Sequence, residues 1–394
     1  MDKIIINNGR IITPFRIIEH GHVIVEDGII TLVGTGPFKD SGGRVIDAQN
    51  HYVSPGFIDL HLHGGGGHDF MDNTIDAFLG AARLHACHGT TSMVPTTLTA
   101  EKEDLLELFS VYRLSIPENT EGSQFLGLHI EGPYFAMNQK GAQDPRYIRL
   151  PDKQEYNHIL SQTNDILRWS VAPELEGAME FARVLLSKNI LPCIAHSDAT
   201  SDEVILALEN GFTHLTHFYS AMSGVMRRNA YRYAGIIESG YLYDQLTVEA
   251  IADGSHLPAS LLQMIYKLKG PSRIALITDA MRAAGMGPGE TTLGSLKDGM
   301  KVIVEDGVAK LPDRSSFAGS VATADLLVRN MVKLAGVPLI HAIQMMSTTP
   351  AQICKLDQRK GRLCAGMDAD IVIFDEDISI QSTIIQGRVL VNKL

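Results

Sequence analysis

Apolar and polar positions along the middle of the chain form two alternating kinds of segment. Short apolar runs of strand length are separated by longer stretches of helical periodicity, which is typical of βα repeats around a parallel barrel. In such a barrel the catalytic side chains lie at the C-terminal ends of the strands. Eight runs fit barrel strands, namely residues 56–63, 90–97, 125–132, 167–174, 192–197, 214–219, 246–253 and 273–280.

The stretches between these runs include several with the periodicity of amphipathic helices. One of them ends at Gly270, and glycine is the residue most often found just past the end of a helix. The two patterns together predict an α/β fold with a (β/α)8 TIM-type barrel. The expected helices include residues 74–89, 175–189, 201–211 and 258–270.

Both ends of the chain consist of short strand-like segments with turns. The C-terminal strands are too few to be stable alone. We therefore expect one small β-sandwich domain, built from residues 1–52 and 363–394, with the catalytic barrel of residues 53–362 inserted between its two parts. The strand-like segments are residues 3–13, 22–34, 44–56, 368–377 and 379–394.

The composition is that of an ordinary globular protein, with 45% hydrophobic and 20% charged residues among 394. A net charge of −11 argues against nucleic acid and anionic membrane surfaces as partners, because like charges repel. It does not exclude a small anionic substrate. The N-terminal sequence lacks the features of a secretion signal, and the 4 cysteines form no Cys-x-x-Cys pair. We therefore expect a cytoplasmic protein with reduced thiols.

Two histidines end the first predicted strand, directly before four glycines. Because alternate side chains of a strand share a face, His61 and His63 project together. Such a pair suits two nitrogen ligands on one metal ion, and it would equally suit a solvated strand end. The four glycines, Gly64–Gly67, lack the Lys-Ser/Thr of a phosphate-binding loop, so we interpret them as a sharp backbone turn.

Polar residues able to bind metal end several other predicted strands. Nitrogen and oxygen donors of this kind suit zinc, iron or another divalent transition ion. Each residue has a structural alternative, but their recurrence at strand ends predicts that they converge. His129 either orients Glu131 or is structural, and we interpret His214 as structural. The candidate ligands are His61, His63, Glu131, His196, His217 and Asp279.

The order and spacing of several motifs resemble the amidohydrolase superfamily, and most closely its N-acetylglucosamine-6-phosphate deacetylases. The motifs are PGFIDLHLHG, GLHIEGPYF, CIAHSDAT, HLTHFYSAM, ADGSHLP and ITDAMRAAGMGPG. The resemblance spans nearly the whole chain. It implies Glu131, His196 and His217 as metal ligands, His61 and His63 as ligands of a second ion, and Asp279 as the catalytic residue. One or two ions per subunit and a homodimer are consistent with it.

The same resemblance implies the substrate-contacting positions. These are Ala142, Gln143, Ser220, Ala221, His256, Phe317, Ala318 and Gly319, with Arg228 or its neighbour Arg227 as the phosphate-binding arginine. Three departures stand out. Ser220 and Gln143 replace an asparagine and a histidine found in some members, and the segment 223–235 replaces the usual Gly-Arg-Glu-Pro loop.

The implied reaction is hydrolysis of the acetamide of N-acetylglucosamine 6-phosphate by metal-activated water, with Asp279 as general acid and base. A related substrate such as N-acetylgalactosamine 6-phosphate is an alternative, because the divergent segment lies where specificity would be set. A noncatalytic barrel that binds amino sugars is a further alternative. Superfamily members that use a carbamylated lysine on strand four are disfavoured, since residues 167–174 contain no lysine.

Overall fold

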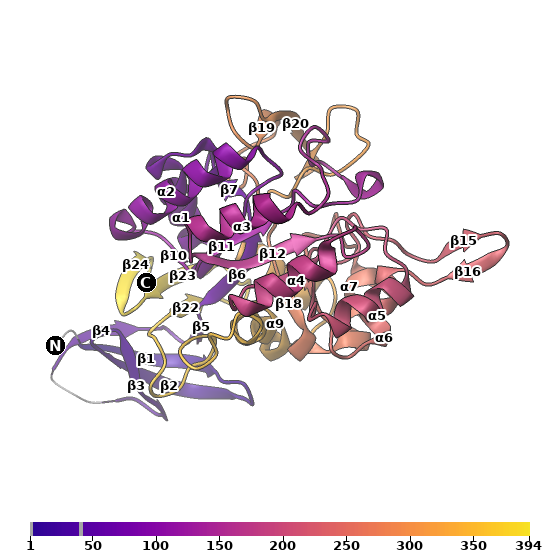
Figure 1. Cartoon of the computed structure of the whole chain (residues 1–394). Helices are drawn as coiled ribbons and strands as arrows, with labels where there is room; N and C mark the ends of the chain where they lie inside the picture. The colour runs from indigo at the N-terminus through magenta and orange to yellow at the C-terminus, as the bar shows by residue number, and fades with distance from the viewer. Residues whose placement is uncertain (1–2, 39–41) are drawn as a thin grey trace.

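Eight parallel strands form a barrel whose order in space follows their order in the chain (Figure 1). The computed structural model describes residues 3–38 and 42–394, so residues 1–2 and 39–41 of the predicted small domain lie outside the described residues. Two parallel bridges, Leu62–Ala280 and Thr96–His129, join the two halves of the ring. The strands are β6 (Phe57–Leu62), β9 (Thr90–Pro95), β11 (Leu128–Glu131), β12 (Ile166–Val171), β13 (Leu191–Ile194), β14 (His214–Leu215), β17 (Thr247–Ala250) and β18 (Ile274–Leu276).

Helices surround this ring, and their apolar faces form the main core together with the outward-facing strand residues. The predicted strands and the four predicted helices are confirmed, with helix ends within a few residues. The helices are α1 (Ile75–Cys87), α2 (Lys102–Glu118), α3 (Lys153–Gln162), α4 (Ala178–Ser187), α5 (Ser201–Glu209), α6 (Ile236–Leu242), α7 (Ala259–Lys269), α8 (Ala324–Lys333), α9 (Leu339–Met346) and α10 (Thr348–Ile353).

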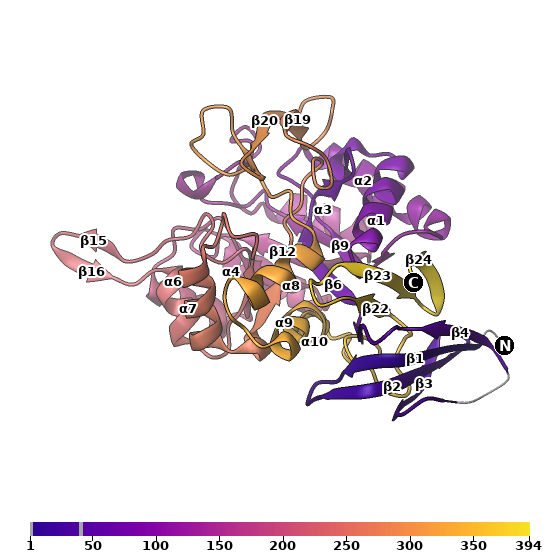
Figure 2. The ribbon, with the colours of Figure 1, turned by 180° about the vertical axis from the view of Figure 1, so that it is seen from behind.

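A second sheet combines the two ends of the chain and lies below the barrel in Figures 1 and 2. Its central contact is the antiparallel pairing of β5 with β22, which joins the N-terminal strands to the C-terminal ones. The Asp27-Gly28 turn, with φ of 50° and 80°, links β2 to β3 as a tight hairpin. The strands are β1 (Lys3–Ile12), β2 (Ile17–Glu26), β3 (Ile29–Thr35), β4 (Arg44–Asp47), β5 (Tyr52–Pro55), β22 (Ile371–Phe374), β23 (Ile380–Ile385) and β24 (Arg388–Asn392).

Two insertions extend from the barrel on the side of the strands' C-terminal ends. The hairpin of β15 (Met226–Arg228) and β16 (Tyr231–Tyr233) projects away from the body (Figures 1 and 2). A small sheet of β19 (Gly289–Leu293), β20 (Met300–Glu305) and β21 (Val308–Lys310) lies above the barrel. The second insertion therefore stands over the barrel end where catalytic residues are expected.

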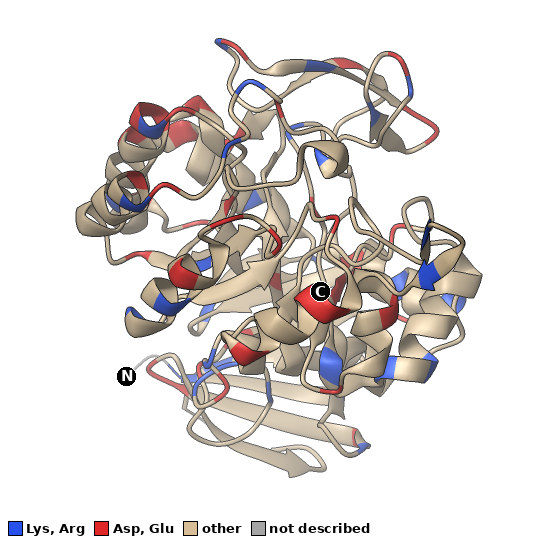
Figure 3. Ribbon diagram, turned by 45° about the vertical axis from the view of Figure 1, so that its right-hand side comes forward, with Lys and Arg blue, Asp and Glu red and all other residues tan. Residues whose placement is uncertain are grey.

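In the ribbon of Figure 3, acidic and basic residues are intermixed along helices and loops. No continuous basic stripe runs across this view of the described residues, in keeping with the net charge of −11. None of the helices found among residues 3–38 and 42–394 has both the length and the apolar composition needed to cross a membrane.

Lys269, at the end of α7, is a buried lysine that we expect to destabilise the fold. It is 2% exposed, and its Nζ donates to the Tyr243 carbonyl at 3.0 Å. Burial, with the nearby charge of Arg273, lowers the pKa of Lys269 to about 8. Below that pH the folded protein holds a buried ammonium. Above it the folded lysine is neutral while the unfolded one still binds a proton, so stability rises with pH.

Lys269→Met should therefore raise the free energy of unfolding at pH 7 by about 1 kcal/mol. The advantage over wild type should shrink as pH rises from 8 to 10. Urea unfolding at several pH values measures both effects. A variant that is less stable than wild type at pH 7 would mean that the hydrogen bond to Tyr243 outweighs the burial of the charge.

Candidate metal centre and active site

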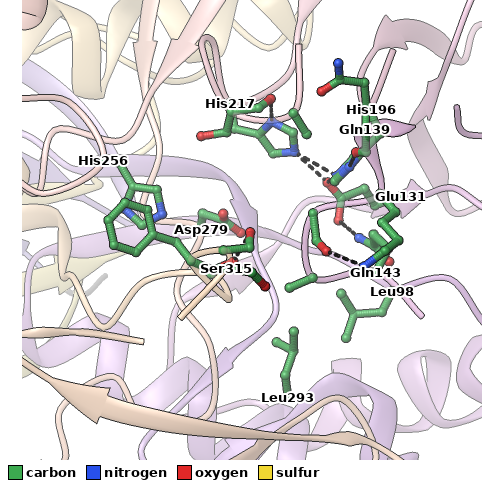
Figure 4. Close-up of a pocket in the computed structure, with 18 of the residues that line it drawn as sticks. Leu98, Glu131, Gln139, Gln143, His196, His217, His256, Asp279, Leu293 and Ser315 are labelled. Atoms are coloured by element: carbon green, nitrogen blue, oxygen red, sulfur yellow. Dashed lines mark hydrogen bonds and ion pairs between the residues drawn. The ribbon is translucent and has the colours of Figure 1, made fainter. Parts of the chain in front are cut away.

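Six side chains from five strands meet at the C-terminal end of the barrel. They form two groups, His61, His63 and Asp279, and Glu131, His196 and His217, each with ligand atoms within 4.8 Å of one another. Glu131 lies between the groups. Its Oε1 is 3.0 Å from His217 Nε2, and its Oε2 is 3.5 Å from His63 Nε2 (Figure 4 shows Glu131, His196, His217 and Asp279). The predicted convergence is therefore present in the structure.

Each of the four histidines turns its Nε2 toward the centre because its Nδ1 is held from outside. His61 Nδ1 lies 3.2 Å from Glu249, and the other three contact backbone carbonyls. A carbonyl can only accept, so in those three imidazoles Nδ1 carries the proton and Nε2 is left for the centre. The carbonyls are those of Thr96 for His63 (3.3 Å), Gln139 for His196 (2.7 Å) and Ser220 for His217 (3.2 Å).

The nitrogen positions fit a divalent transition metal. His61 Nε2 and His63 Nε2 are 3.3 Å apart, and His196 Nε2 and His217 Nε2 are 3.2 Å apart. Two nitrogens bound to one tetrahedral zinc ion at about 2.0–2.1 Å would be roughly 3.3–3.4 Å apart. Two lone pairs facing each other at this distance repel unless a cation lies between them. The donor set therefore suits metal in both groups.

The backbone at three of these residues has an uncommon conformation. His196, His217 and Asp279 have φ of 45°, 31° and 49°, in the left-handed region that residues other than glycine rarely occupy. All three come two or three residues after the end of a barrel strand, where the backbone bends over the end of the barrel. Such strain persists only where the surrounding structure holds it, and it concentrates at functional sites.

The charges of the centre favour ionised carboxylates. Burial raises the pKa of Asp279, but positive charge on His61 and His63, which a bound metal ion would replace, outweighs it and lowers that pKa. Burial likewise raises the pKa of Glu131, but its histidine neighbours hold the pKa well below the usual range. Asp279 Oδ1 is 3.2 Å from His63 Nε2, and Asp279 lines the pocket above the centre. Asp279 is thus placed and ionised as a base.

A pocket of about 800 Å³ opens above the centre, and most predicted site residues line it. His61 lies beneath it, fully buried. Among the substrate-contacting candidates, His256 contacts Phe317 with ring centroids 4.5 Å apart and the ring planes tilted by 44°. The Nδ1 of His256 lies 2.7 Å from Asp253 Oδ2, which leaves its Nε2 for a ligand. The predicted residues that line the pocket are His63, Glu131, Ala142, Gln143, His196, His217, Ser220, Ala221, His256, Asp279, Phe317 and Gly319.

Three predicted substrate-contacting residues lie outside the catalytic pocket of their own chain. Arg227 and Arg228 lie on the projecting β15–β16 hairpin and do not line the catalytic pocket of their own chain. Asn229 and Ala230, with φ of 48° and 71°, form a tight turn that pairs Arg227 with Arg232 and carries both arginines outward. Ala318 points instead into the core of the β19–β21 insertion. Basic residues that sequence reasoning missed line the pocket, namely Lys140, Lys310 and Arg314.

Glu249, which lies below the metal centre, was also not identified from the sequence. Glu249 on β17 is fully buried, and its Oε2 accepts the backbone N–H of His217 at 3.0 Å besides contacting His61. Its Oε1 contacts His214 Nε2 at 3.0 Å and pairs with the buried guanidinium of Arg168. One carboxylate therefore holds a histidine of each group. Charged residues inside predicted barrel strands were the available sequence signal, since such residues are almost never buried unless paired.

Gln143 links the centre to the loop after β9. Its Nε2 donates to Glu131 Oε2 at 2.7 Å, and its Oε1 accepts the backbone N–H of Thr99 at 2.8 Å. The amide is thereby fixed in orientation with its donor end toward the centre. It is 4% exposed and lies at the pocket wall, where a donor could stabilise developing negative charge on a carbonyl oxygen.

Solved structures share this architecture over the full chain. A mutant of the N-acetyl-D-glucosamine-6-phosphate deacetylase from Mycobacterium smegmatis, in complex with N-acetyl-D-glucosamine-6-phosphate, is 30% identical with a TM-score of 0.90 and full coverage of both chains. The N-acetylglucosamine-6-phosphate deacetylase from Thermotoga maritima is 31% identical with a TM-score of 0.86, over 98% of this chain and 99% of that one. These neighbours support the TIM-type α/β fold.

Sequence comparison likewise finds deacetylases of phosphorylated amino sugars. The N-acetylglucosamine-6-phosphate deacetylase of Vibrio furnissii is 33% identical over 94% of this chain and 92% of its own. The N-acetylgalactosamine-6-phosphate deacetylase of Escherichia coli O157:H7 is also 33% identical, over 96% and 97%. The model of the amidohydrolase family matches residues 52–390. The resemblance predicted from the motifs is thus confirmed: the chain belongs to the amidohydrolase family, whose members are metal-dependent.

Proposed function

We propose that this protein hydrolyses N-acetylglucosamine 6-phosphate to glucosamine 6-phosphate and acetate. The observation that carries the proposal is an ionised Asp279 beside two metal-ligand groups, in one pocket with His256. A bound divalent ion lowers the pKa of water and polarises an amide carbonyl. Asp279 takes the proton from the attacking water and delivers it to the leaving amine nitrogen, while Gln143 donates to the carbonyl oxygen.

The ligand set supports one or two ions per subunit, with zinc or iron as the metals its nitrogen and oxygen donors suit best. Strand β12 contains Arg168 but no lysine that could be carbamylated to bridge two ions. Glu131, which lies between the two groups, would take that bridging role instead. A β-sandwich form of the small domain, the boundaries 1–52, 53–362 and 363–394, a homodimer and a cytoplasmic location belong to the same proposal.

The sequence comparison also supports N-acetylgalactosamine 6-phosphate as a second candidate substrate. The Escherichia coli relative named for N-acetylgalactosamine 6-phosphate is as similar, at 33%, as the relative named for the gluco substrate. The β15–β16 hairpin, where this chain departs from the usual loop, lies in the segment that would set specificity for the sugar. A noncatalytic amino-sugar-binding barrel is disfavoured, because binding alone does not require Asp279 among the ligand groups.

The test is acetate release from both phosphorylated sugars by the zinc- or iron-loaded protein, with the same protein after chelation as control. Release that depends on metal and exceeds release from unphosphorylated N-acetylglucosamine supports the proposal. Release from the galacto sugar alone would keep the chemistry and change the substrate, and no release from any of the three would refute a deacetylase.

His256→Asn should weaken recognition of the phosphate. Asp253 holds the ring with Nε2 available to the pocket, and asparagine is too short to reach the same point. The KM for the phosphorylated sugar should rise about tenfold or more, with a smaller effect on kcat. Steady-state kinetics with phosphorylated and unphosphorylated sugars separate the effects. An equal loss on both sugars would place His256 outside the phosphate site.

A further inference from the structure

A second cavity, of about 340 Å³, adjoins the catalytic pocket, and we call it the annex pocket. The proposed reaction makes no use of it. Its walls come from the segment 71–73, the loop 98–100, the start of α2, the loop 142–147 and residues 293–300 of the insertion. Four residues line both cavities and form the shared wall, namely Leu98, Ala142, Gln143 and Leu293.

The shared wall lies on the acyl side of the catalytic pocket. In Figure 4, His256 and the pair Leu98 and Gln143 lie on opposite sides of Asp279. In the proposed function the sugar phosphate lies toward His256, and the reacting amide carbon lies near Asp279. The acyl group, on the other side of that carbon, then points toward Leu98 and Gln143.

The shared wall is largely apolar, whereas the annex pocket behind it is polar. Leu98, Leu293 and Ala142 offer contacts that suit methylene groups. Behind them, Thr99 Oγ1 and Asn73 Oδ1 have no hydrogen-bond partner within the described part of the chain. Thr99 is 5% exposed and lines the annex pocket. A buried hydroxyl without a partner is uncommon in a folded protein, and here it marks an unsatisfied hydrogen-bonding group at the wall of the annex pocket.

The charges around the annex pocket select for a hydrogen-bond donor. Asp104, Glu107 and Asp298 line it, with Lys297 as its basic residue. Asn73 turns its Nδ2 to the Asp104 carbonyl at 3.1 Å, so its Oδ1 remains an acceptor. Acceptors therefore predominate over donors. A ligand end that donates, such as a hydroxyl or an ammonium, matches this lining better than a carboxylate does.

From this juxtaposition we infer that the annex pocket is an acyl-group site, which admits amides whose acyl chain is longer than acetyl and ends in a hydrogen-bond donor. The inference rests on the proposed function and extends its substrate class. The reaction is the same hydrolysis: the water oxygen bonds to the carbonyl carbon, the C–N bond breaks, and the nitrogen leaves protonated as the sugar amine. The second product is the longer carboxylate.

The experiment compares four amides of glucosamine 6-phosphate with the metal-loaded wild-type protein: acetyl, butyryl, 4-hydroxybutyryl and 4-aminobutyryl. The released sugar amine is measured in each case. We expect kcat/KM for the two donor-bearing amides to exceed that for butyryl by about fivefold to tenfold, as one buried hydrogen bond would produce. Hydrolysis of all three longer amides more than a hundredfold slower than the acetyl amide would overturn the inference.

Thr99→Val tests the hydroxyl directly, because valine keeps the shape and the backbone N–H that binds Gln143. It should reduce the preference for 4-hydroxybutyryl over butyryl to about 1, whereas Thr120→Val, at an exposed threonine outside both cavities, should leave that preference intact. An unchanged preference in Thr99→Val would refute the role of Thr99. Hydrolysis of longer amides but not acetyl would refute the proposed function and keep the annex pocket, and no hydrolysis of any amide would refute both.

Discussion

Asp279→Asn is expected to reduce kcat for acetate release by about three orders of magnitude. Asparagine has the shape of aspartate but cannot take a proton from water or deliver one to the amine. The amine is a poor leaving group without that proton, so both halves of the reaction lose their catalyst. Coupled assays for acetate and for the sugar amine measure the loss, and substrate affinity measured by calorimetry should change far less.

The same carboxylate belongs to a ligand group with His61 and His63, so the metal content of the variant must be measured as well. Loss of activity at full metal content assigns Asp279 to proton transfer, whereas loss in step with metal content assigns it to metal binding. Asp325→Asn is a matched control, since Asp325 is also 8% exposed but lies at α8, where it binds His88 at 3.1 Å. It should leave kcat within about twofold. More than a tenth of wild-type activity in Asp279→Asn would refute its role as base.

Much of this centre was predictable from local pattern. Alternation along one strand places His61 and His63 on a common face, and the barrel architecture places the ends of parallel strands together. The left-handed backbone at His196 and His217 was not predictable, since neither histidine is a residue type that requires it. The sequence therefore predicts which side chains gather but not how the backbone turns them inward.

Features that depend on contacts between distant segments could not be placed from the sequence. Arg228 holds the family's position by counting along the chain, but hairpin pairing between Arg227 and Arg232 decides where it lies. Lys310 and Arg314 line the pocket because the β19–β21 insertion folds over it, and no spacing rule brings that insertion to His256. Position in a motif thus does not fix where a side chain lies when the loop that carries it has changed its fold.

Glu249 illustrates the same limit inside the barrel. A glutamate in the predicted strand 246–253 does not indicate a role by itself, because its partners come from three other strands. His61 lies on β6, Arg168 on β12, and His214 and His217 on or just after β14. Burial raises the pKa of Glu249, but the guanidinium of Arg168 and the contacts with His214 and His61 hold it well below the usual range. The carboxylate is thus charged and fully paired.

Glu249→Gln is expected to weaken metal binding by about 10- to 100-fold, as is typical when the partner of a ligating histidine is changed. The uncharged amide no longer neutralises Arg168, and its NH2 group competes for the positions that His61 and the His217 backbone occupy. Breaking a buried ion pair should also reduce the free energy of unfolding by about 3–5 kcal/mol. Metal titrations with a competing chelator and urea unfolding measure the two effects separately.

The double variant Arg168→Met, Glu249→Gln separates positioning from stability. With no buried charge left unpaired, the free energy of unfolding should recover much of its loss, because an apolar side chain of similar length replaces the guanidinium. Metal affinity should stay low, since His61 Nδ1 still lacks the carboxylate that fixes which ring nitrogen faces the centre. Recovery of both metal affinity and the free energy of unfolding would mean that Glu249 acts only through the stability of the fold. Recovery of the free energy of unfolding alone would identify Glu249 as the residue that orients the metal-binding histidines from below.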